Sequence, residues 1–293
     1  MPQDIRASSQ QLLRRVPVGM GELRTIAEAF AESLHGVVRT LSIPFQYTYS
    51  QVHSLHWQRT HIAARIRGGG ALDDAQQAEI DRAIAKEKFE EYLRGEGQKV
   101  LADEVVERLL QLKNEPEALA AARELTRQGV VLTWSAIEVL SRDAFVHLLN
   151  SKPQLSDALL AEQFNRKRFA TDRIEWQTLA SYGFDLSGKL GSYLISKADL
   201  SNVPAIRAAY TALFPGAVQL RSCLSDERLW HLSQKRHLIV HRRGIVDDAY
   251  IGATGTGLKV GDVLWAAPAE VEEAIEAAMA LGAELLEQVA NAA

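Results

Sequence analysis

The chain has 293 residues, of which 47% are hydrophobic, 24% charged and 7% aromatic, as in an ordinary soluble protein. Its net charge of −4 excludes a histone-like protein that coats nucleic acid by bulk charge, and its single cysteine, Cys223, excludes a disulfide scaffold. No apolar run approaches the roughly 18 residues that span a bilayer, and the N-terminus lacks the apolar region of a secretory signal. We therefore expect a cytoplasmic protein without membrane contact.

Apolar residues at helical spacing dominate the N-terminal part of the chain. A first helix should end at Pro44, and a second should run to the glycines at 68–70. The charged segment 73–112 is predicted to be helical, with a break near Gly95. Residues 1–113 are thus expected to form an N-terminal helical region with a regulatory or dimerising role.

From residue 114 onward the pattern predicts a helical bundle. Asn114 followed by Glu117 has the spacing of a capping box. Residues 151–202 mix short helices with polar turns and are expected to be inserted into the bundle. The segment 244–265 alternates and is rich in glycine and threonine, which predicts a small β-hairpin. The fold class is therefore mainly α, with one hairpin before the C-terminal helix. The main helices are expected over residues 117–150, 204–213, 225–243 and 268–291.

The helix expected over residues 225–243 carries an arginine within its apolar stripe. At about 100° per residue, Arg236 falls in the middle of that stripe. An unpaired buried guanidinium costs several kcal/mol, so Arg236 requires a carboxylate, a phosphate or access to a cleft. The stripe itself consists of Leu229, Leu232, Ile239 and Val240.

A second face of the same helix gathers imidazole side chains. His237 and His241 are four residues apart, which places one ring above the other, and Trp230 and Gln234 share this face. Together with Arg236, the histidines could hold a phosphodiester and move protons near neutral pH. From the spacing alone, solvated histidines beside a structural arginine are an equally good interpretation.

A short signature, Arg236-His237-Leu238-Ile239-Val240-His241, lies in the middle of this helix. It resembles the R-x4-6-H signature of the HEPN superfamily (higher eukaryotes and prokaryotes nucleotide-binding), in which a polar residue follows the arginine. The glycine-rich segment and the acidic helix that follow are also similar to bacterial HEPN proteins, so the resemblance covers about residues 117–293. It implies a helical bundle that commonly forms a homodimer with two signature helices facing each other across a cleft.

The resemblance also implies an activity, because many HEPN domains are metal-independent endoribonucleases of toxin–antitoxin or phage-defence systems. It implies His241 as the general acid/base, Arg236 as the group that stabilises the phosphate, and His237 as an assisting residue. The RNA 2′-hydroxyl would attack the adjacent phosphate, with no cofactor and no metal. Substrate contacts are expected from Gln234, Arg242 and Arg243.

Glu138, on the helix expected over residues 117–150, is a candidate supporting residue. We expect it to pack near Arg236 and orient it, although a solvated Glu138 is an equal alternative. HEPN toxins that are controlled by an adenylylating antitoxin usually carry a tyrosine where this chain has Arg243. This departure argues against that control and leaves any antitoxin or regulatory partner protein unidentified.

Two other functions are compatible with the same pattern. The first is a catalytically inactive HEPN-like module that binds a nucleotide or a protein. The second is a helical scaffold in which the arginine and histidines form an interface network. A metal site is not expected, because no glutamate follows His237 as in HExxH, and the histidines at 53, 56 and 61 do not share one helical face.

Overall fold

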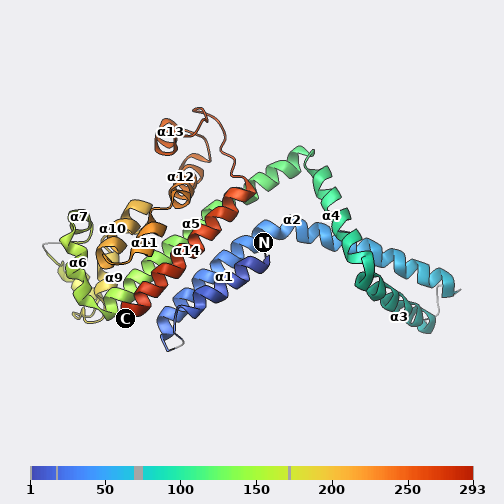
Figure 1. The fold of residues 1–293 in the computed structure, drawn as a ribbon, viewed down its shortest axis with the longest axis horizontal. Helices are drawn as coiled ribbons and strands as arrows, with labels where there is room; N and C mark the ends of the chain where they lie inside the picture. Colours follow the sequence, from blue (N-terminus) through green and yellow to red (C-terminus); the bar gives the residue numbers. More distant parts are fainter. Residues whose placement is uncertain (1, 18, 69–74, 171–172, 293) are drawn as a thin grey trace. The chain divides into compact units, whose positions relative to one another are not determined.

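The structure, a computed structural model, describes residues 2–17, 19–68, 75–170 and 173–292 (Figure 1). These residues are mainly helical, which confirms the mainly α part of the expected fold class. They contain no strand, and their only β contact is an isolated antiparallel bridge between Ile245 and Val263.

The β-hairpin expected over residues 244–265 is therefore wrong. The segment instead forms α13 (Asp248–Thr254), because the Asp247 carboxylate accepts a hydrogen bond from the Tyr250 amide and caps a helix there. Gly255 then ends α13 in the left-handed conformation, with a φ of 62°. This helix interrupts the alternating pattern, so only the single bridge remains of the expected pairing.

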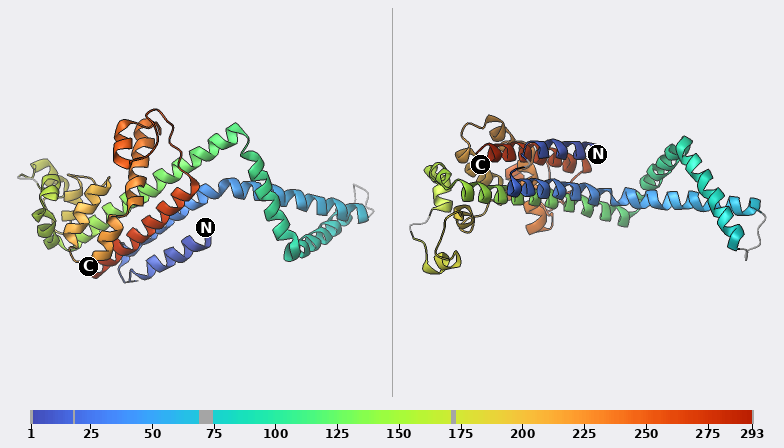
Figure 2. Two further views of the ribbon diagram at one scale, coloured as in Figure 1. Left: turned by 45° about the horizontal axis from the view of Figure 1, so that its top comes forward. Right: turned by 90° about the horizontal axis from the view of Figure 1, so that it is seen from below.

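The chain divides into two compact units, one comprising Met1–Arg39 and Arg123–Ala293 and the other Thr40–Ala122. This division differs from the boundary expected at residue 113, because the first 39 residues belong to the same unit as the Arg–His helix. Packing across long sequence separations joins these segments, as α14 contacts α1, α11 and α12. Figure 2 shows α1 next to α14 in both of its views.

The larger unit is built around the buried face of α5 (Pro116–Ser151). Trp134 and Phe145 on this face are almost completely buried, and Tyr210 donates a hydrogen bond across the core to the Ser141 carbonyl. The other elements of this unit are α1 (Pro2–Arg14), the first part of α2 (Gly21–Gly68), η2 (Pro153–Leu155), α6 (Ser156–Ala161), α7 (Gln163–Phe169), α8 (Trp176–Ser181), α9 (Leu190–Ile195), α10 (Val203–Leu213), α11 (Val218–Leu224), α12 (Glu227–Arg242), α13 and α14 (Pro268–Ala292).

The smaller unit contains the second part of α2, followed by α3 (Ala75–Tyr92) and α4 (Gln98–Leu112). The break expected near Gly95 is confirmed, since Gly95 has non-helical angles inside the π-helical turn between α3 and α4. Pro44 does not end a helix, contrary to expectation, and α2 continues through it to Gly68. A proline removes one backbone hydrogen bond, and buried side chains on both sides of it keep the helix in place.

Candidate functional site

Helix α12 carries the expected site residues, and both of its ends are fixed by hydrogen bonds. At its start, the Asp226 carboxylate accepts from the Arg228 amide at 2.8 Å, so Asp226 is the N-cap. At its end, Arg243 has a left-handed φ of 57°, and the Gly244 amide donates to the Leu238 carbonyl at 3.0 Å. These hydrogen bonds therefore define where α12 begins and ends.

The buried side of α12 differs in part from the expected stripe. Leu229 and Leu232 are buried as predicted, but Val240 is 48% exposed. Leu238 takes the buried position instead, because it packs against Val246, Tyr250 and Leu264. α13 and the segment after it pack on this side of α12, and this packing decides which face of α12 is buried. The periodicity of α12 alone does not predict that face.

Arg236 contacts the residue expected to be its partner. Its Nη2 lies 3.4 Å from Oε2 of Glu138 on α5, and the two side chains are 25% and 20% exposed. The Nε atom of Arg236 is buried and has no hydrogen-bond partner among the described residues. Among the described residues, the guanidinium therefore has one carboxylate contact and donors that remain unused.

The two histidines lie together on the solvent side of α12. The ring centroids of His237 and His241 are 4.6 Å apart, with an angle of 47° between the ring planes, and both residues are exposed. Their proximity follows from the four-residue spacing in a continuous helix. Gln234, one turn earlier, is half-buried. The structure thus brings the imidazoles together at the surface, on the helix that also carries Arg236.

The two arginines at the end of α12 have different surroundings. Arg242 is exposed, and its Nε lies 3.1 Å from Oδ2 of Asp247. The Tyr250 amide, and then Arg242, lower the pKa of the Asp247 carboxyl. Arg243 is also exposed and has no ion pair among the described residues. It is therefore the better placed of the two to meet an incoming anion.

Two anchors of α12 lie outside the expected site. Trp230 was expected on the histidine face, but its indole nitrogen donates to the Ala253 carbonyl of α13 at 2.9 Å. Lys235 Nζ lies 2.5 Å from Glu270 Oε1 of α14. No local signal predicts either contact, because each joins residues more than twenty positions apart on different elements.

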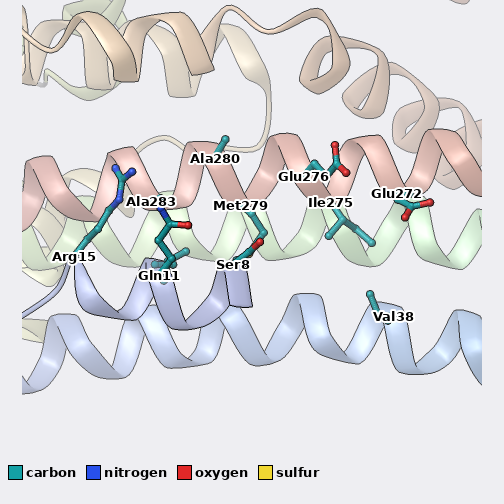
Figure 3. A pocket seen from close by; sticks show the side chains of 11 residues that line it. Ser8, Gln11, Arg15, Val38, Glu272, Ile275, Glu276, Met279, Ala280 and Ala283 are labelled. Atoms are coloured by element: carbon teal, nitrogen blue, oxygen red, sulfur yellow. The ribbon is translucent and has the colours of Figure 1, made fainter. Parts of the chain in front are cut away.

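A separate hollow of about 360 Å³ lies between α1, α2 and α14 (Figure 3). Apolar side chains such as Leu12, Ile275 and Met279 make up much of its lining. Figure 3 shows Arg15 near one end, where its guanidinium binds Glu284 and Glu287. No lining side chain among the described residues has a buried polar atom without a partner, so this hollow offers little chemistry.

The described residues contain no group of three or more His, Cys, Asp or Glu side chains that could hold a metal ion. Within the same residues, no helix has the length and apolar character needed to cross a membrane. Comparison with models of known families, with curated proteins and with solved structures found no match.

Proposed function

We propose that the protein is a metal-independent endoribonuclease of the HEPN type and that α12 is its catalytic helix. The observation that supports this proposal best is the state of Arg236, which contacts Glu138 through one nitrogen while its Nε is buried without a partner. A guanidinium with unused donors on the same helix as two exposed imidazoles suits a phosphodiester substrate. The biological role would be that of an RNA-cleaving effector in phage defence or a toxin–antitoxin system.

The proposed reaction uses the residues of α12 as follows. A neutral His241 accepts the proton of an RNA 2′-hydroxyl, whose oxygen attacks the adjacent phosphorus. The bond from phosphorus to the 5′-oxygen breaks, and a protonated His237 gives that leaving oxygen its proton. The products are a 2′,3′-cyclic phosphate and a 5′-hydroxyl. Arg236 stabilises the negative charge that builds on the phosphate oxygens in the transition state.

The RNA would be held by the remaining polar side chains at this end of α12. Arg242 and Arg243 would contact neighbouring phosphates, and Gln234 would contact a sugar or a base. Because the chain is acidic overall, these contacts are local, and binding should weaken as the salt concentration rises. The resemblance to HEPN domains implies a homodimer, so the proposed active form has two α12 helices that face each other.

The test is an RNA cleavage assay with EDTA present, which compares the wild type with His241→Ala. His61→Ala in the smaller unit serves as the matched control, because it also removes an imidazole. We expect the wild type and the control to leave cyclic phosphate ends and His241→Ala to be at least about 100-fold slower. Equal cleavage by His241→Ala would overturn the assignment. Absence of cleavage by the wild type would favour the catalytically inactive module that binds a nucleotide or a protein.

A further inference from the structure

A polar cavity of about 320 Å³ lies beside a different face of α12 from the one that carries the histidines. Side chains of α5, α12, α13 and α14 and of the segment after α13 surround it. The polar side chains are of two kinds. Hydrogen-bond donors lie on α12, on α13 and just after α13, and carboxylates lie on α14. The polar lining residues are Arg228, His231, Lys235, Tyr250, Thr254, Thr256, Glu270 and Glu273.

Two of the donors have no partner within the described part of the chain. Tyr250 is only 5% exposed, yet its hydroxyl makes no hydrogen bond there. Burial, together with the charge of Glu270, raises the pKa of Tyr250 to about 12, so the hydroxyl keeps its proton at neutral pH. His231 is half-buried and likewise has no hydrogen bond or ion pair among the described residues. A ligand acceptor would give the Tyr250 hydroxyl the hydrogen bond that it lacks within the described residues.

The charged groups of the cavity are only partly satisfied by one another. The Lys235 side chain is 13% exposed, and its ammonium donates one hydrogen bond, to Glu270. An ammonium has three donors, so two remain. Glu273, one turn further along α14, is exposed and has no ion pair among the described residues. Arg228 is already occupied, because Asp226 holds its guanidinium at 2.8 Å and Glu276 lies 3.8 Å away.

We infer that this cavity binds a small zwitterion of the amino-acid type. The ligand carboxylate would accept from the Lys235 ammonium and the Tyr250 hydroxyl, and the ligand ammonium would pair with Glu273. A simple anion fits less well, because the carboxylates of Glu270 and Glu273 would repel it. A simple cation would leave the buried donors without an acceptor. This inference concerns a different cavity from the proposed catalytic residues and does not depend on the ribonuclease activity.

The experiment is saturation-transfer NMR on the full chain with a mixture of the common L-amino acids, followed by titration of those that bind. Acetate and methylammonium are titrated separately, because they carry only one half of the proposed charge pattern. We expect at least one amino acid to bind and to raise the thermal midpoint, and both single-charge compounds to bind at least about tenfold more weakly.

The variants assign the binding to the cavity. Tyr250→Phe removes only the hydroxyl, and its affinity should fall about tenfold. Tyr193→Phe is the matched control, because Tyr193 is also a buried tyrosine whose hydroxyl has no partner among the described residues, but it does not line this cavity. Glu273→Gln lies at an exposed position, so it tests the site even if Tyr250→Phe fails to fold. Acetate binding as tightly as the amino acids, no binding by any amino acid, or unchanged affinity in Glu273→Gln would overturn the inference.

Discussion

Arg236 and Glu138 are 98 residues apart in the sequence, and their side chains meet at 3.4 Å between α12 and α5. The contact is long for a hydrogen bond, and both groups are three-quarters or more buried. Glu138 therefore supplies the counter-charge that a mostly buried guanidinium needs, without using all of its donors. In the proposed reaction, this contact would hold Arg236 in place while it stabilises the phosphate.

Replacing Glu138 by glutamine keeps the shape of the side chain and removes its charge. We expect Glu138→Gln to lower the free energy of unfolding by about 1 kcal/mol and RNA cleavage by about tenfold, because Arg236 loses its counter-charge and its fixed position. Urea denaturation and the cleavage assay measure the two effects. Glu124→Gln, on the same helix but 55% exposed, is the control and should change neither by much. Unchanged stability and activity in Glu138→Gln would show that the contact has no supporting role.

A substitution at Arg243 should change stability and RNA binding in opposite directions. Its left-handed φ of 57° disfavours every residue except glycine and, to a lesser degree, asparagine. Arg243→Gly should therefore raise the free energy of unfolding by about 0.5–1 kcal/mol while it removes a charge from the proposed phosphate-binding end. The slope of log affinity for single-stranded RNA against log salt should flatten by about 0.7. An unchanged slope would place the RNA contacts elsewhere.

The cap of α12 makes the stability of this helix pH-dependent. Arg228, through its side-chain hydrogen bond, lowers the pKa of Asp226 in the folded state. The contribution of Asp226 to stability is therefore complete above its unfolded pKa of about 3.9 and is lost as the pH falls through the lower folded value. Asp226→Ala should cost about 1 kcal/mol near neutral pH, because it removes the cap. Urea denaturation below about pH 3 should show a much smaller difference from the wild type, and an equal difference at both pH values would contradict this account.

At Gly282, α14 packs directly against the side chain of Phe30 on α2. A Cβ at this position would lie 2.2 Å from an aromatic carbon of the buried Phe30. Gly282→Ala should therefore destabilise the protein by about 1–3 kcal/mol, since the surrounding core is packed. Gly252→Ala in α13 is the control, because no atom lies within 4 Å of the added carbon and alanine favours a helix. Thermal unfolding of both variants checks this, and an undisturbed Gly282→Ala would mean that Phe30 can move aside.

Helical periodicity predicted the helices around the site, and the unsatisfied charge of Arg236 predicted that it needs a partner. Both inferences use only the identity and spacing of residues that are close together in the sequence. The position of Leu238 under α13 could not be predicted in this way, because residues distant in sequence decide which side of α12 is covered. The same holds for Lys235 and Glu270, which look like separate surface charges in the sequence and form an ion pair in the fold.

The expected hairpin and the expected stop at Pro44 failed for a shared reason. Glycine, threonine and proline are local signals, and in both places a stronger interaction outweighed them. The carboxylate of Asp247 caps a helix where the alternation predicted a strand. Around Pro44, the buried Val37 and Val52 keep α2 helical at the expense of one backbone hydrogen bond.

The ion pairs from Arg15 to Glu284 and Glu287 join residues 269 and 272 positions apart. During translation at about 5–20 residues per second, α1 would leave the ribosome roughly 15–50 s before the helix it packs against. The apolar side chain of Leu12, which is buried in the finished protein, has to remain exposed or covered by a chaperone during that interval. A nascent chain that stops before α14 should therefore be prone to aggregation, even though most of the larger unit has already been made.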